Sequence, residues 1–457
     1  MGTRVGSALL AILVSAILAR LLDPENLGYY FLIFSVVTIS SNLVRAGQGI
    51  VAIRLIAEAE GLGQLGRARQ TALLTLFGVS AAAVLFALVF YFFLGDWLFA
   101  DFFSAPAILG LSGLVALWIV IVGIRTQVAF IFRGMHAVRL AATFNGFLSS
   151  LVTLILFVYL FTQQAEPQLW EVVGYSIAGA FAGLLLSLVF LRARLSKFRG
   201  EGSIRASEIG SIALPLFLLS LTNIVLTQGD MVLAGNLLGE IDIAFYGVAL
   251  RLKGLVILPM FVLGTVMSPL IAKLYAQNEK KKLEKIMRLS STIAVVPFTL
   301  IMIFLLLTGD SIVAWIFGEA YRDAYPILMT LFAGLFISAI MGSGQQLMTM
   351  SGHERMLLPI RIAGGLFAIV GGILAAPSMG IIGIALSFAL ATAGINIAIT
   401  LKARKLTGIS CYIYSPAYFL SRESRQELTQ ELRSLVRESL ARKRGKQRKG
   451  HKTIDEE

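Results

Sequence analysis

The chain has 457 residues, of which 57% are hydrophobic and only 14% are charged, and its mean hydropathy is +0.83. So few charged side chains cannot cover a hydrophobic core of this size in water, which excludes a water-soluble protein. About half of the net charge of +13 comes from the C-terminal end, so the charge does not indicate a nucleic-acid-binding protein.

Apolar windows of the length that crosses a bilayer, roughly 20 residues, recur along the whole chain. They predict an all-α integral membrane protein of about twelve transmembrane helices. In chain order the predicted spans are 5–22, 28–53, 72–94, 107–130, 138–162, 169–191, 209–236, 243–272, 290–308, 324–350, 356–376 and 380–401.

Lys and Arg are distributed unevenly between the two sets of connections. They gather in the connections after the second, fourth, sixth, eighth and tenth spans, whereas the opposite connections contain acidic residues and a single Arg, Arg322. Because positively charged loops stay in the cytoplasm, this pattern predicts a multi-pass protein of the inner or plasma membrane with both termini cytoplasmic.

The C-terminal segment 406–457 is predicted to be a basic cytoplasmic tail. Apolar residues recur at helical spacing from Leu428 to Leu440, which favours an amphipathic helix that binds anionic membrane lipids. The alternative is a solvated tail that binds no membrane, whose positive charges only keep the C-terminus on the cytoplasmic side. The one cysteine, Cys411, precludes a disulfide within the chain and indicates no thiol or zinc chemistry.

The spans divide into two similar six-helix bundles, 1–200 and 201–405. Leu18–Leu22 and the acidic turn that leads to Tyr30 resemble residues 233–246, so that Tyr30 corresponds to Tyr246. Because each half has an even number of spans, a pseudo-twofold axis along the membrane normal should relate the two bundles.

The motif of residues 18–30, together with Tyr246–Arg251 and Pro269–Ala272, resembles the Wzx-type polysaccharide or O-antigen flippases. These form the polysaccharide transporter branch of the multidrug/oligosaccharidyl-lipid/polysaccharide exporter superfamily. The resemblance implies a V-shaped pair of bundles that moves a polyprenyl-pyrophosphate-linked oligosaccharide from the cytoplasmic to the outer leaflet by alternating access, in polysaccharide or lipopolysaccharide biosynthesis. It also implies contact with other glycan-assembly membrane proteins.

Polar side chains spaced three or four residues apart form stripes on the second, seventh and tenth spans. Facing one another, these stripes would line a cleft between the halves, although Ser, Thr and Asn also join helices in membranes. A charge in hydrocarbon costs ~2.5–3.5 kcal/mol, so intramembrane arginines are candidates for binding an anion. The predicted cavity residues are Arg45, Arg251, Arg125, Asn42, Gln48, Asn223 and Gln345.

Asp230 and Arg251 lie at similar depths on consecutive spans, which favours an ion pair between them. The alternative is that Asp230 takes up H⁺ or Na⁺ and couples transport to an ion gradient. Arg251 and Lys253 are about 200° apart around a helix, so only one of them, Arg251, is expected to face the cleft.

No catalytic residues, metal ligands or cofactor are predicted. The histidines, His136, His353 and His451, are dispersed, and no Gly-rich phosphate-binding loop is present in the sequence. The transporter prediction leaves three alternatives: a peptidoglycan lipid-precursor flippase, a cation-coupled multidrug exporter of the same superfamily, or a non-transporting scaffold. The excess of basic over acidic intramembrane residues argues against the exporter of cations.

Overall fold

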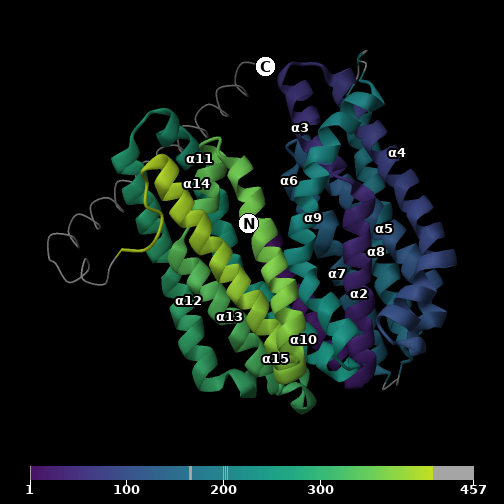
Figure 1. The fold of residues 1–457 in the computed structure, drawn as a ribbon. Coiled ribbons are helices and arrows are strands. Elements are labelled where there is room, and N and C mark those ends of the chain that lie inside the picture. The colour runs from purple at the N-terminus through teal and green to yellow at the C-terminus, as the bar shows by residue number, and fades with distance from the viewer. Residues whose placement is uncertain (1, 164–166, 199, 201, 203, 415–457) are drawn as a thin grey trace.

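A computed structural model describes residues 2–163, 167–198, 200, 202 and 204–414. Within these residues the chain is helical, with no strand, as the sequence predicted for the fold class. The predicted amphipathic helix of the tail lies outside the described residues. Figure 1 shows two groups of steep helices, with α11–α15 on one side and α3–α8 on the other.

The N-terminal half contains eight α-helices and four shorter helical segments. They are α1 (Gly2–Leu21), α2 (Pro24–Arg45), α3 (Gln48–Gly61), α4 (Leu65–Val89), η1 (Phe90–Leu94), η2 (Trp97–Phe102), η3 (Pro106–Leu111), α5 (Ser112–Gly134), α6 (Val138–Ala142), η4 (Thr143–Phe147), α7 (Leu148–Thr162) and α8 (Leu169–Leu195).

The C-terminal half begins with a long helix that follows the basic loop at residues 192–205. Its elements are α9 (Ala206–Leu237), α10 (Glu240–Val256), α11 (Leu258–Ala276), α12 (Lys280–Phe317), η5 (Glu319–Tyr321), α13 (Ala324–Met341), α14 (Gly344–Met350), η6 (Glu354–Met356) and α15 (Leu357–Thr407).

Nine helical segments in the described part of the chain are long and apolar enough to cross a membrane. Three further crossings complete the twelve that the sequence predicts. The shorter apolar helix α1 is one, α10 and α11 together form another, and α15 divides into two at Gly380, whose φ of 56° is not helical.

Two breaks inside predicted spans lie at residues with positive φ. Ala46 (φ 43°) and Gly47 (φ 78°) separate α2 from α3, and Gly342 (φ 73°) separates α13 from α14. Such a residue stops the regular hydrogen-bond ladder and lets the next helix start in a new direction. The second span of each half is composed of two helices, α2 and α3 in the first half and α10 and α11 in the second, although Ile257 between α10 and α11 has a negative φ of −78°.

The two halves pack against each other chiefly through α2 and α10, with α1 and α9 beside them. Asp23 caps α2, accepting a hydrogen bond of 2.7 Å from the backbone N–H of Asn26, and Pro24 begins the helix. Elsewhere α9 and α13 pack on α15, and α5 packs on α4 and α8. Large apolar side chains such as Trp315, Leu307 and Phe77 are exposed, as expected for a surface in contact with lipid.

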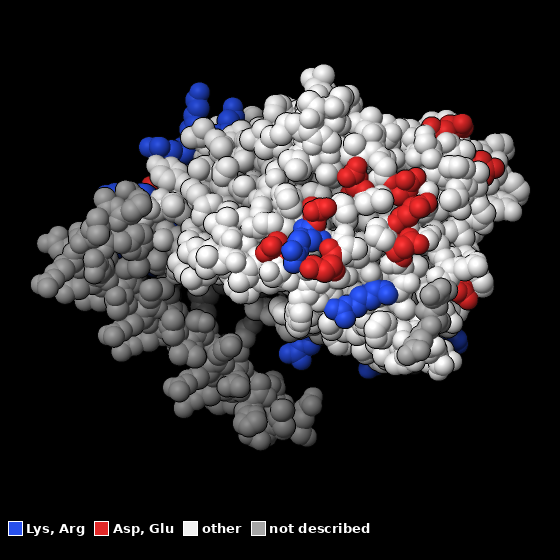
Figure 2. Space-filling view, turned by 90° about the horizontal axis from the view of Figure 1, so that it is seen from below, with Lys and Arg blue, Asp and Glu red and all other residues white. Residues whose placement is uncertain are grey.

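The two ends of the bundle differ in charge. The turns that begin α2, α10 and α13 carry Asp and Glu, and Figure 2 shows a concentration of acidic side chains on this face. We call it the acidic end. The opposite face, where α3 meets α4 and α8 leads to α9, contains most of the basic loops, and we call it the basic end.

Candidate functional site

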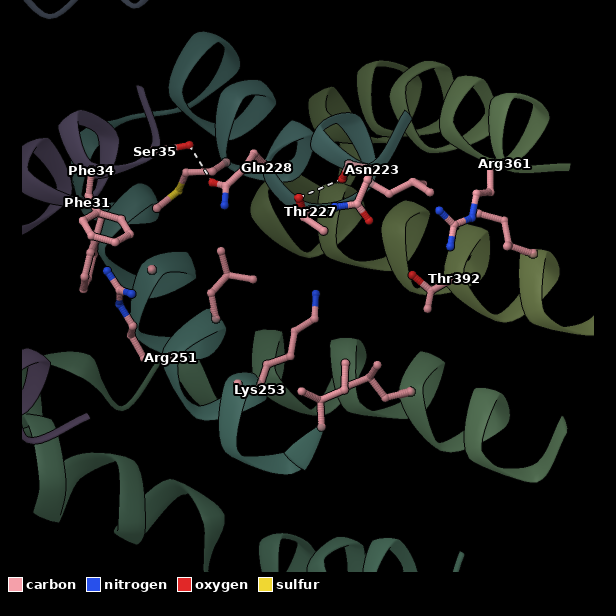
Figure 3. Close-up of a pocket in the computed structure, with 18 of the residues that line it drawn as sticks. Phe31, Phe34, Ser35, Asn223, Thr227, Gln228, Arg251, Lys253, Arg361 and Thr392 are labelled. Atoms are coloured by element: carbon pink, nitrogen blue, oxygen red, sulfur yellow. Dashed lines mark hydrogen bonds between the residues drawn. The ribbon is translucent and has the colours of Figure 1, made fainter. Parts of the chain in front are cut away.

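A cavity of about 510 Å³ lies where the two halves meet, and we call it the central cavity. Side chains of α2, α9, α10, α13, α14 and α15 surround it (Figure 3). Its lining residues are Phe31, Phe34, Ser35, Asn223, Leu226, Thr227, Gln228, Met231, Gly247, Leu250, Arg251, Lys253, Gly254, Ile257, Leu335, Gln345, Arg361, Thr392, Ile395 and Asn396.

Three basic side chains, Arg251, Lys253 and Arg361, line the central cavity, and no carboxylate is among the described residues around it. The Arg251 guanidinium lies over the ring of Phe34, 4.3 Å from its centroid, and 5.3 Å from that of Phe31. Stacking on aromatic faces holds the cation in a fixed place while leaving its edge available. The cavity is therefore an electropositive site within the membrane-spanning part of the protein.

Lys253 corrects a sequence-based expectation. Helical geometry predicted that only Arg251 of the two would face the cleft, yet both line the cavity. The cavity contacts a wide face of α10 from Gly247 to Gly254. Arg251 and Lys253 lie on opposite edges of this face, and their long side chains both reach the cavity. In Figure 3 Lys253 points into the middle of the space, whereas Arg251 lies beside Phe31 and Phe34.

Neutral polar groups complete the lining. The hydroxyl of Ser35 on α2 donates to Oε1 of Gln228 on α9, at 3.0 Å, and so joins the two halves (Figure 3). Asn396 on α15 donates to the hydroxyl oxygen of Ser338 on α13, at 3.1 Å. Asn223 and Gln345 line the cavity, which is where the sequence analysis placed them.

Asp230 does not form the predicted pair with Arg251. Its carboxylate is buried and accepts hydrogen bonds from the hydroxyl of Tyr246, at 3.1 Å, and from the N–H of Met231, at 2.9 Å. No ion pair joins it to Arg251, although both residues belong to the described part of the chain. The reason is the rotation of α10, which points Tyr246 toward Asp230 and Arg251 toward α2.

Four of the predicted cavity residues lie outside the lining of the central cavity: Arg45, Asn42 and Gln48 on α2 and α3, and Arg125 on α5. Arg45, in the last turn of α2, donates to the side-chain oxygen of Asn42 and lies over the ring of Phe130, 5.5 Å from its centroid. Gln48 follows the break at Ala46 and Gly47, so that its side chain packs near Gly78 of α4. The structure groups Arg45 and Asn42 at the basic end of α2.

Arg125 lines a separate cavity of about 250 Å³ inside the N-terminal half. It lies on α5 and donates a hydrogen bond to the hydroxyl of Ser149 on α7. Arg251 also borders this second cavity, so its side chain lies between the two spaces.

Sequence reasoning missed several lining residues, of which Lys253 and Arg361 carry charge. Arg361 was not among the predicted cavity residues, although it lies in the second turn of α15. Its position four residues after the start of that helix was the available signal. Gln228 and Asn396 were missed because each occurs singly, outside the stripes of regularly spaced polar residues.

Comparisons with known proteins agree with this geometry. The family model described as polysaccharide biosynthesis protein matches residues 1–275, and the MatE model matches residues 215–374. No curated protein matches the chain significantly.

Three solved structures have a similar fold. An inward-facing multidrug resistance MATE transporter of the MOP superfamily has a TM-score of 0.68, with 17% identity over 88% of this chain and 94% of its own. The lipid II flippase MurJ, in an inward closed conformation, has a TM-score of 0.67, with 15% identity over 87% of this chain and 86% of its own. A MOP superfamily transporter from Pyrococcus furiosus, whose binding pocket is described as having reverse polarity, has a TM-score of 0.57, with 14% identity over 89% of this chain and 95% of its own.

The fold is therefore the two-lobed, twelve-helix fold of the MOP superfamily of membrane transporters. Because the first family model covers more than half of the sequence, the chain belongs to the polysaccharide biosynthesis protein family. This confirms the resemblance that the motifs of residues 18–30 and 246–251 indicated.

Proposed function

We propose that this protein is a flippase that moves a polyprenyl-pyrophosphate-linked oligosaccharide from the cytoplasmic to the outer leaflet by alternating access. The observation that carries the proposal is the lining of the central cavity, which contains Arg251, Lys253 and Arg361 and, among the described residues, no carboxylate. The buried carboxylate of Asp230 behind this lining interacts electrostatically with Lys253, so the cations outnumber the one nearby acidic group. Cations in excess in a membrane interior are costly and persist where they meet a charged partner.

The chemistry of the lining suits such a cargo. Guanidinium groups bind phosphate oxygens in a bidentate manner, and Arg251 is fixed by stacking on Phe34. The amides of Asn223 and Gln345 offer the donors and acceptors that sugar hydroxyls need. Leu226, with other apolar side chains, supplies an apolar wall for the first part of the lipid.

The direction of transport rests on the charge asymmetry of the bundle. If the basic end is cytoplasmic, then Arg45 and Asn42, near that end of α2, lie where an anionic headgroup would enter from the inner leaflet. The acidic end, where α2 contacts α10, would then be the closed outer side. We propose the units 1–200 and 201–405 as the two moving bodies.

Complementation of a flippase-deficient strain tests the function. Lipid-linked glycan that reaches the outer leaflet would be measured with the wild type, with Arg251→Ala and with Arg361→Gln. Arg322→Gln, an exposed arginine at the acidic end, is the matched control. We expect both cavity variants to lose most of the translocated glycan while the control keeps it.

Full translocation by Arg251→Ala and Arg361→Gln, at wild-type protein levels, would contradict the proposed site and favour a scaffold role. The peptidoglycan lipid-precursor flippase is an alternative with the same anionic chemistry, and MurJ shares the fold. Binding of purified protein to polyprenyl-pyrophosphate glycan and to a peptidoglycan lipid precursor, measured side by side, separates these two functions. A cation-coupled drug exporter would require an acidic lining, which the described residues do not provide.

A further inference from the structure

The second cavity, inside the N-terminal half, is a distinct feature that transport of a large glycolipid does not require. It lies among α1, α2, α5, α7 and α8, and its volume of about 250 Å³ corresponds to roughly eight water molecules. An oligosaccharide on a long lipid does not fit there. Any occupant must be small.

The lining of this second cavity is positively charged and rich in hydroxyl groups. Arg125 is its central cation, and Ser149, Ser150, Thr153 and Ser176 surround it. No Asp or Glu belongs to the described residues that line it. The charge of Arg125 is therefore not neutralised by any described carboxylate in the cavity.

The hydrogen bonds of Arg125 leave capacity for a ligand. One terminal nitrogen donates to Ser149, whereas the Nε is buried and has no hydrogen-bond partner. A buried donor on a charged group without a partner is unfavourable, so its retention calls for an explanation. A small anion in the cavity would accept from the guanidinium and from the neighbouring hydroxyls.

We propose that the second cavity is a binding site for a small monovalent anion of the chloride class, held by Arg125. The site does not depend on the proposed flippase function. The Tyr30 hydroxyl, which lies 3.0 Å from that of Ser176, belongs to the same wall and adds a further polar group.

Arg251 connects this anion site to the central cavity, because its side chain borders both. An anion near Arg125 partly neutralises Arg251 and so reduces the positive charge offered to a ligand in the central cavity. Coupled binding is reciprocal: chloride lowers the affinity of the central cavity for a polyanion, and the polyanion lowers the affinity of the second cavity for chloride by the same factor.

Equilibrium binding of radiolabelled chloride to the purified full chain in nanodiscs tests the proposal. We expect saturable binding at one site per chain, displaced by bromide and nitrate but not by lactobionate, a disaccharide acid that is larger than the cavity. Arg125→Gln should weaken binding by about tenfold or more, since it removes a charged donor, and Arg125→Lys should restore part of it.

Arg361→Gln is the matched control, because Arg361 lines the central cavity but not the second one. It should leave chloride affinity unchanged. Three results would overturn the proposal: no saturable chloride binding by the wild type, displacement by lactobionate, or loss of binding in Arg361→Gln with retention in Arg125→Gln. The first two use the wild type, so they decide the question even if Arg125→Gln does not fold.

Discussion

Asp230 illustrates how one buried charge is stabilised in this protein. Its carboxylate accepts from Tyr246 and from a backbone N–H, which accounts for a charge placed deep in the bundle without any contact with Arg251. A carboxylate with this much hydrogen bonding serves first to join α9 to α10. We infer a structural role and not ion coupling.

Tyr246→Phe should therefore lower the free energy of unfolding by about 1.5–3 kcal/mol, because it removes a hydrogen bond to a buried charged group. In Asp230→Asn the amide oxygen can accept from the Met231 N–H while the NH2 donates to the Tyr246 hydroxyl oxygen, so this variant should have a much smaller effect. The midpoint of thermal unfolding in detergent measures both changes. Loss of glycan translocation in Asp230→Asn with unchanged stability would instead indicate that Asp230 couples transport to H⁺ or Na⁺.

Cys411 lies in the segment 408–414, which follows α15. The segment folds back on the C-terminal half, where the Ser291 hydroxyl donates to the carbonyl of Cys411 at 2.7 Å, and the N–H of Ile413 donates to the carbonyl of Ile340 at 3.1 Å. Burial, with the carboxylate of Glu284 nearby, raises the pKa of the Cys411 thiol to about 12.

The Cys411 thiol should therefore react slowly with maleimide in the folded protein at neutral pH. Because the folded pKa exceeds that of a free thiol, about 8.5, the stability contributed by the neutral thiol is complete below that pH and is lost as pH rises toward 12. Ser291→Ala should release the segment and speed up labelling, measured by mass spectrometry. Rapid labelling of the wild type would show that the segment does not stay packed.

At the scale of the helices, the contact between α2 and α10 depends on glycine. A Cβ on Gly247 would lie 2.0 Å from the ring of Phe31, and one on Gly28 would lie 2.0 Å from the carbonyl oxygen of Glu240. The hydroxyl of Tyr29 donates to the carboxylate of Glu240 at 3.0 Å. These contacts hold the two halves together near the acidic end.

Gly247→Ala should separate α2 from α10, since Phe31 is buried and cannot move aside freely. We expect a longer distance between spin labels at Glu25→Cys and Glu319→Cys in the variant. Gly254→Ala is the control on the same helix, because a Cβ there meets nothing within 4 Å. An unchanged distance in Gly247→Ala would show that the contact of Gly247 with Phe31 does not determine how closely α2 and α10 approach each other.

The elements also show which features a sequence can predict. Apolar windows located all the crossings because lipid contact requires them along their whole length. The break at Ala46 has no such signal, since an alanine with positive φ looks ordinary in a sequence. Helical periodicity does not continue across this break. The side chain of Gln48 therefore points toward Gly78 and not toward the central cavity. Arg361 was missed for a related reason: hydropathy shows that a helix crosses, but not how deep each residue lies.

At the scale of the whole molecule, the two ends of the interface differ in their contacts. Near the acidic end, buried rings and backbone pack closely between α2 and α10. At the basic end the Arg67–Glu208 ion pair, 2.9 Å long, has half-exposed partners, and such pairs contribute about 0–1 kcal/mol. The buried side chains of Val51 and Leu55 on α3 pack there against Ile209 and Ala213 of α9, so apolar packing supplies most of the contact at this end.

If the proposed cycle is correct, addition of a polyprenyl pyrophosphate should shift the population toward opening at the acidic end. The label pair at Glu25 and Glu319 should then move apart, and a second pair at Leu62→Cys and Lys281→Cys, at the basic end, should move closer. Arg251→Ala should suppress both changes. Double electron–electron resonance measures these distances, and equal responses in the wild type and in Arg251→Ala would rule out the cavity as the trigger.

The contact between Gly28 and Glu240 also acts as a fulcrum. From Gly28 to the end of α2 at Arg45 the helix is about 26 Å long, so a tilt of about 10° around that point moves its far end by about 4–5 Å. A small rearrangement of a few closely packed atoms thereby opens a gap of several ångströms at the other end of the helix. This amplification requires that positions 28 and 247 remain glycine, because a Cβ at either position would push α2 and α10 apart.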